Sequence, residues 1–237
     1  MLPAQNTAPS REAQAFVTKA STTGPATIYT SYGLVQGTDD QFAPVDGDSS
    51  TGGLGQTVDA NPLLQCGPMA NGTQYYHIHV YVGVMVNGVQ YATPDAIGMN
   101  NAPTDDPNGQ VNSGSCFYAI HTHDASGIVH IETYKVVGTG TYNYNSVLFH
   151  LGDLLDVWGQ PISANGFANF SGPVTIFTAP PSNTTAGTSG FQYSGSYVQY
   201  SGDPRSLPLT THETIWIEVG TVVGPAQLPR VHFYPAH

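Results

Sequence analysis

Three histidines, one aspartate and one glutamate lie within HTHDASGIVHIE, residues 121–132, of a chain in which charged residues make up only 9%. The segment DASG begins with Asp and ends with Gly, which predicts a four-residue turn between two antiparallel strands. His121 would then lie opposite His130. Because side chains alternate between the two faces of a sheet, His123 and Glu132 should share the face of His121 and His130. Opposed residues have Cβ atoms about 5 Å apart, so these histidines can converge on one ion.

A second pair, His77 and His79 in YYHIHVYV, has the same alternating spacing. If that strand neighbours the first pair of strands, five imidazoles share one face, with Glu132 one step further along. Imidazole suits zinc, copper, iron or nickel rather than calcium or magnesium. We therefore predict a transition-metal site, with copper or zinc as the first candidates, and Glu132 as a general base or an additional ligand. The predicted ligands are His77, His79, His121, His123 and His130.

Other interpretations of the cluster remain open. Five imidazoles exceed one tetrahedral shell, so some would support the ligands by hydrogen bonds, or the site would hold two ions. The metal could also serve only to join strands in a structural extracellular or assembly protein. Without a metal, the histidines would form a polar core whose stability falls below about pH 6 as imidazoles become protonated. If the protein is an enzyme, zinc would favour hydrolysis by an activated water, and copper would favour oxidative chemistry.

The remaining polar residues divide by position. His212, just before a predicted strand, either reaches the site or only begins that strand. Asp124 is expected to hydrogen-bond within its turn rather than bind metal. His150 is expected to be a surface or capping residue beside a short helix. The other candidates are expected to be bystanders or ordinary strand carboxylates: His232, His237, Glu213 and Glu218.

The charge balance excludes several classes of function. With 5 Lys and Arg against 16 Asp and Glu, the formal net charge is −11, and no basic stripe could neutralise nucleic-acid phosphates. No apolar run reaches the roughly 18–20 residues that a membrane span needs. Signatures of zinc peptidases, serine hydrolases, phosphate loops and dinucleotide-binding folds are also absent from the sequence. An oligomer is possible, and neither the partner nor the substrate can be named from the sequence.

The two cysteines bear on the compartment. Cys66 and Cys116 could form a disulfide or ligate the metal as thiolates. By strand parity Cys116 points away from His121 and His123, which favours the disulfide. A disulfide here would close a loop of about 50 residues and would stabilise the folded state by roughly 4 kcal/mol. A surface rich in hydroxyls and amides agrees with a secreted or periplasmic protein. No apolar leader follows Met1, so we expect the numbering to begin after a removed signal peptide.

The pattern along the chain predicts a mainly β fold, an antiparallel β-sandwich or barrel with one short helix. Residues 1–57 are predicted to be an N-terminal extension, with a helix capped by Ser10 and a Gly-, Ser- and Asp-rich loop. Residues 58–237 are predicted to form the His-rich β domain. Within it, the NG pair at 87–88 indicates a tight hairpin, and residues 152–158 indicate the helix.

The chain also resembles a group of uncharacterised bacterial secreted or lipoprotein-type domains. The resemblance runs from about Val58 to the C-terminus and is carried by YYHIHVYVGVMVNG, CFYAIHTHDASGIVHIE, LGDLLDVWGQPIS and GDPRSLPLTTHETIWIEVG. Members of the group generally pair a Cys ahead of each His strand, which matches Cys66 and Cys116. The insertion APPSNTTAGTSGFQYSG departs from the pattern. The group has no established activity, so the resemblance implies a location and a fold rather than a reaction.

Overall fold

The computed structural model describes residues 27–30, 64, 66–67, 76–91, 93–100, 111–124, 126–133, 149–182 and 192–233. These residues form short strands and one α-helix, α1 (Leu151–Trp158), with a 3-10 turn, η3, at Pro204–Ser206. Among the described residues, no helix is long and apolar enough to cross a membrane. The strands are β1 (Thr27–Thr30), β2 (Tyr76–Val86), β3 (Val89–Tyr91), β4 (Met99–Asn100), β5 (Cys116–Phe117), β6 (Ile120–His121), β7 (Ile128–Thr133), β8 (Ile162–Ser163), β9 (Gly166–Phe167), β10 (Phe170–Ser171), β11 (Val174–Ala179), β12 (Gln192–Tyr193), β13 (Val198–Tyr200), β14 (Thr214–Val219) and β15 (Arg230–Phe233).

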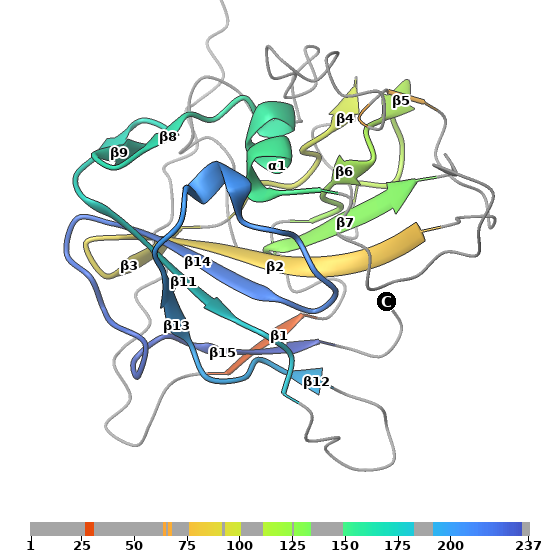
Figure 1. The fold of residues 1–237 in the computed structure, drawn as a ribbon. Coiled ribbons are helices and arrows are strands. Elements are labelled where there is room, and N and C mark those ends of the chain that lie inside the picture. The colour runs from red at the N-terminus through yellow and green to blue at the C-terminus, as the bar shows by residue number, and fades with distance from the viewer. Residues whose placement is uncertain are drawn as a thin grey trace, which may run out of the picture.

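A seven-stranded sheet forms the centre of the molecule (Figure 1). Its strand order is β13-β11-β14-β2-β7-β6, and β3 pairs with β2 at one end. The mainly β prediction with one short helix is confirmed. Two details differ from the expectation. The sheet is mixed, because β2 and β14 run parallel, and its described strands do not close into a barrel.

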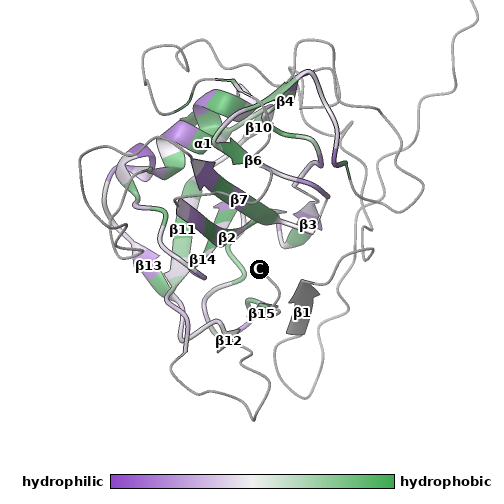
Figure 2. Ribbon diagram, turned by 90° about the vertical axis from the view of Figure 1, so that its right-hand side faces the viewer, coloured by the Kyte–Doolittle hydropathy of each residue, from purple (hydrophilic) through white to green (hydrophobic). Residues whose placement is uncertain are grey.

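The longest strand, β2, has a different role on each face. Ile78, Val80 and their alternating neighbours belong to the apolar core that also contains α1. His77 and His79 lie on the opposite face, as the period of two requires. The predicted hairpin follows, with Asn87 and Gly88 both at positive φ, 52° and 79°. In Figure 2, hydrophobic residues follow β2 and β7, whereas α1 carries both hydrophobic and hydrophilic residues.

Each face of the central sheet is covered by a different layer. Figure 1 shows α1 on one side and the small β1-β15-β12 sheet on the other. A second apolar cluster fills the latter side, around Trp216 and Tyr81, whose ring centroids are 5.3 Å apart. Gly83 allows this packing, because a Cβ at that position would lie 2.4 Å from the Trp216 ring. The histidines share this face with the apolar cluster, at the end of the sheet formed by β2, β7 and β6.

The helix α1 begins at Leu151, one residue before the predicted start, and ends at Trp158 as predicted. The backbone N–H of His150 donates to Oδ2 of Asp153 at 2.7 Å, and His150 therefore stands at the capping position expected of it. Gly159 ends the helix in the left-handed conformation, with φ 73°. Leu154 and Trp158 are fully buried, so α1 closes the core on the face opposite the histidines.

Cys66 and Cys116 form a disulfide, with Cα atoms 5.4 Å apart. The preference for a disulfide over thiolate ligation is thereby confirmed. Of the predicted extension, residues 1–57, the structure describes β1, which pairs in parallel with β15. The expected helix after Ser10 and the loop at 36–60 lie outside the described residues. The division into two regions stays a prediction.

Candidate metal centre

Three neighbouring strands place the histidines in one row. His79 on β2 pairs in register with His130 on β7, and His130 pairs with His121 on β6. The next pair of β2 and β7 on the same face is His77 with Glu132. The predicted pairing of His121 with His130 is therefore confirmed. The strand β2 also neighbours this hairpin, as the prediction of five imidazoles on one face required. It brings His77 and His79 to the same face.

The turn between β6 and β7 fixes the end of this row. Oδ1 of Asp124 accepts the backbone N–H of Ser126 at 3.0 Å, and Oγ of Ser126 accepts the N–H of Ile128 at 3.2 Å. Asp124 thus has the turn role predicted for it. These bonds hold the backbone of His123 just beyond the end of β6, where its ring lies 4.5 Å from that of His130 between centroids.

His121 and His123 are oriented by backbone carbonyls. Nδ1 of His121 lies 3.0 Å from the oxygen of Tyr118, and Nδ1 of His123 lies 2.7 Å from the oxygen of Val111. A carbonyl oxygen only accepts, so each Nδ1 must carry the proton, and each Nε2 presents a lone pair. Histidines that bind metal usually have this arrangement, with the second nitrogen donating to a carbonyl or carboxylate. Nε2 of His121 is buried and has no hydrogen-bond partner among the described residues.

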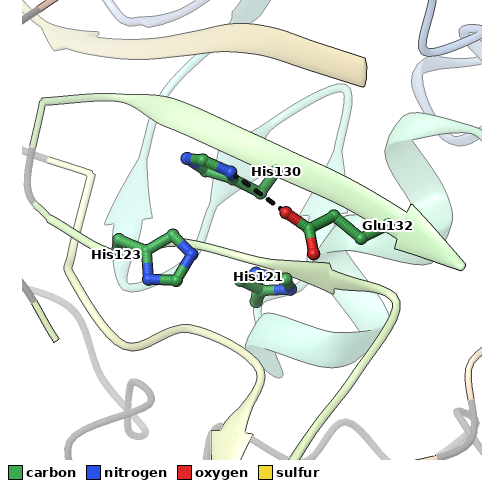
Figure 3. Close-up of side chains that lie close together, drawn as sticks. All are labelled: His121, His123, His130 and Glu132. Atoms are coloured by element: carbon green, nitrogen blue, oxygen red, sulfur yellow. Dashed lines mark ion pairs between the residues drawn. The ribbon is translucent and has the colours of Figure 1, made fainter. Parts of the chain in front are cut away.

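The donor atoms fall into two overlapping groups. One ligand atom from each of His121, His123, His130 and Glu132 lies within 4.8 Å of the others (Figure 3). The second group consists of His77, His79 and His130, under the same limit. Both groups are made of imidazole nitrogens with at most one carboxylate, a donor set that suits zinc or copper. The buried cluster could therefore hold a metal ion.

Burial keeps the central histidines neutral. The pKa of His121 falls to about 3, chiefly because burial disfavours its charged form and then because His123 and His130 would repel that charge. Burial is also the main reason that the pKa of His130 falls to about 4 and that the pKa of His123 is lowered. Burial alone would raise the pKa of Glu132, but hydrogen bonds with His130 and His77 lower it well below its usual range. Three neutral imidazoles beside a carboxylate are ready to bind a cation without first losing protons.

The other candidate residues lie apart from these groups. The backbone N–H of His212 donates to the carbonyl of His79, and the His212 ring packs on Phe233. His212 therefore lies in the turn that precedes β14 and belongs to neither donor group of the described residues. Glu213 receives a hydrogen bond from Thr210 at 2.9 Å. The side chain of His232 and all of His237 lie outside the described residues.

Sequence reasoning missed two features of this region. The carbonyls of Tyr118 and Val111, which orient two of the histidines, are backbone groups and leave no signal in residue types. Glu218 was expected to be an ordinary strand carboxylate, but it is fully buried. Burial raises its pKa, and its Oε2 accepts the N–H of Val223 at 3.0 Å. A carboxylate among apolar strand residues, TIWIEV, was the available signal.

Comparison with known proteins gives no relative: no family model, no curated protein and no solved structure matches the chain. The resemblance to bacterial secreted or lipoprotein-type domains stays an expectation. What the site does must therefore follow from the positions and chemistry of its own residues.

Proposed function

We propose that this protein is a secreted or periplasmic transition-metal-binding protein whose ion, zinc or copper, is bound by His121, His123, His130 and Glu132. The observation that carries the proposal is the orientation of His121 and His123. In each, the Nδ1–H donates a hydrogen bond to a backbone carbonyl, which leaves the lone pair of Nε2 for another partner. Nε2 of His121 is buried and has no hydrogen-bond partner among the described residues. A buried lone pair left unpaired costs about 1–3 kcal/mol, and a bound cation would remove that cost.

The donor set favours zinc or copper over harder cations. Three imidazoles and one carboxylate match the nitrogen and oxygen ligands that zinc takes in four-coordinate sites. Copper(II) accepts the same donors with a more tetragonal arrangement. The two cysteines cannot contribute thiolates, because they are bonded to each other.

The disulfide supports the proposed compartment. Disulfides form and persist in oxidising environments, such as the periplasm and the exterior of the cell. The Cys66–Cys116 bond suggests such a compartment for this chain. Transition metals outside the cytoplasm would meet a site whose histidines are already neutral at pH 7.

The position of Glu132 favours a second candidate function, in which the ion is catalytic. Oε1 of Glu132 lies 3.0 Å from Nε2 of His77, whose side chain is 33% exposed. If Glu132 keeps this pairing, the three histidines leave a fourth position for water, and Glu132 is placed as the general base. If Glu132 ligates instead, the shell is closed and the ion would join β6 to β7 as a structural element.

Metal content is the decisive measurement. The purified protein, reconstituted with zinc or copper and dialysed, should retain the metal in stoichiometric amount by elemental mass spectrometry. The double variant His121→Ala/His123→Ala should retain less metal than the wild-type protein, whereas His150→Ala should retain as much, because His150 caps α1 away from the cluster. If the wild-type protein retains neither metal after reconstitution, the proposal fails and the histidines form a structural polar core.

A further inference from the structure

The cluster contains more donors than one ion can use. Five imidazoles and Glu132 converge, whereas a tetrahedral zinc site takes four ligands. The proposed site above uses His121, His123, His130 and Glu132, which leaves His77 and His79 outside its set of ligands. Both lie on the same face of the sheet, on the other side of His130 in the strand order.

The rings are arranged symmetrically about His130. Its centroid lies 4.4 Å from that of His79 and 5.9 Å from that of His77. On the other side it lies 4.5 Å from His123 and 5.7 Å from His121. The strand β7 thus carries the central imidazole, with one pair of histidines from β2 and another from β6 and the turn that follows it.

The nitrogens on the β2 side are spaced like ligands of one ion. Nε2 of His77 lies 3.0 Å from Nε2 of His79, and that atom lies 3.1 Å from Nδ1 of His130. Donors around a tetrahedral ion with metal–nitrogen bonds of about 2.0 Å are about 3.3 Å apart. A ring nitrogen has a single in-plane lone pair or proton, so Nε2 of His79 cannot form two good hydrogen bonds to its two neighbours. A cation between the three nitrogens would engage all of them at once.

We propose, on the basis of the function proposed above, that the cluster binds two transition-metal ions side by side, with His77 and His79 holding the second ion and His130 and Glu132 shared between the two. His130 directs Nδ1 toward His79 and Glu132, so its Nε2 faces the side where His123 lies (Figure 3). To bind both ions, the His130 ring releases its proton to solvent. Glu132 directs Oε1 toward His130, and its other oxygen points toward His121 (Figure 3).

The two ions should differ in how readily they exchange. His121 and His123 are 2% and 7% exposed, whereas the side chain of His77 is 33% exposed. The ion on His77 and His79 therefore lies nearer to solvent, and a chelator should remove it first. The ion on His121 and His123 is surrounded by buried residues and should leave more slowly.

Metal stoichiometry of the full chain tests the second ion. After reconstitution with zinc, the wild-type protein should retain two ions per chain, and His77→Ala/His79→Ala should retain one. The milder His77→Gln should lose the second ion by the same assay, with an unchanged unfolding midpoint for its zinc-free form. His150→Ala is the control and should retain two. One ion in the wild-type protein and one in His77→Ala/His79→Ala would overturn the second site and leave the proposed function intact, whereas no ion in either would overturn both.

Copper(II) provides a spectroscopic test that depends on the shared ligands. Two copper ions joined by one imidazole are magnetically coupled, so the wild-type electron paramagnetic resonance signal should be smaller than its copper content requires. In His77→Ala/His79→Ala the remaining copper should give its full, uncoupled signal. Two copper ions that give the full uncoupled signal in the wild-type protein would show that His130 does not join them, and would overturn the shared arrangement.

Discussion

At the scale of single residues, the backbone determines which nitrogen each histidine offers to the site. The carbonyls of Val111 and Tyr118 fix His123 and His121 as Nδ1–H tautomers. Such an arrangement keeps the site ready in the metal-free protein, because no ring must rotate or exchange its proton before it binds. The carboxylate of Glu132 has no single fixed partner, since its Oε1 lies near both His77 and His130.

The substitution Glu132→Gln tests whether this carboxylate is a ligand. Gln keeps the size of the side chain but removes its charge, so zinc affinity should fall at least about tenfold, the lower end of what groups supporting a metal site contribute. Competition titration with a chromophoric chelator measures the affinity. Glu213→Gln, outside the donor groups, is the matched control and should bind as the wild type does. Unchanged affinity in Glu132→Gln would show that Glu132 is not a ligand and would leave it the role of general base.

The metal-free protein should lose stability on mild acidification. His121 and His130 have folded-state pKa values of about 3 and about 4, whereas an unfolded histidine titrates near 6.5. Between these values the unfolded chain binds more protons, so the free energy of unfolding falls as the pH drops below about 6.5, on the order of a few kcal/mol in total by about pH 4.

Urea unfolding in the presence of a chelator measures this dependence. The midpoint should be lower at about pH 5 than at about pH 7.5, the range in which histidines change charge. In His121→Leu, which lacks one of the buried titrating groups, the decrease should be shallower. His150→Ala should behave as the wild type does. A midpoint that does not change over this range would contradict the burial of neutral histidines.

At the scale of elements, the period of a strand was enough to predict which side chains share a face. The DASG turn also determined the pairing of β6 with β7, because its length sets the register. Sequence did not reveal that β2 lies between β7 and β14, or that β2 and β14 are parallel, since neither pair is joined by a short turn. Non-local pairing depends on the packing of the whole core, which residue patterns describe poorly.

Gly83→Ala should lower the free energy of unfolding by disturbing the pairing of β2 with β14. The new Cβ would lie 2.4–2.8 Å from three ring carbons of Trp216, a rigid and fully buried side chain. Overpacking of this kind costs about 1–3 kcal/mol. Thermal or urea unfolding measures the cost, with Gly67→Ala as the control, because a Cβ at Gly67 meets nothing within 4 Å. Equal stability of Gly83→Ala and the wild-type protein would contradict the close approach of Gly83 to Trp216.

At the scale of the whole molecule, the histidine cluster and the apolar cluster around Trp216 are neighbours on one sheet face, because Tyr81 and Ile128 form the next pair on that face after His79 and His130. That face is polar where β2, β7 and β6 meet, whereas the opposite face of the same strands packs in the apolar core with α1. Ions bound between imidazoles of β6 and β7, and of β2 and β7, would add to the stability of this end of the sheet. The disulfide acts nearby, because Cys116 lies in β5, shortly before β6.

Zinc should consequently raise the stability of the complete protein. A ligand that binds only the folded state at about 100 times its dissociation constant adds about 2.7 kcal/mol. For a chain of this size that corresponds to a rise in Tm of about 5–10 °C. Differential scanning calorimetry at neutral pH, with zinc and then with excess chelator, should show the rise and its reversal in the wild type and in His150→Ala, and a smaller rise in His121→Ala/His123→Ala. If Tm does not respond to zinc, copper or chelator but falls as the pH is lowered, the cluster is a polar core without metal. A response to metal in the wild type that is smaller in the double variant instead requires that an ion binds at these histidines and holds β6 and β7 together.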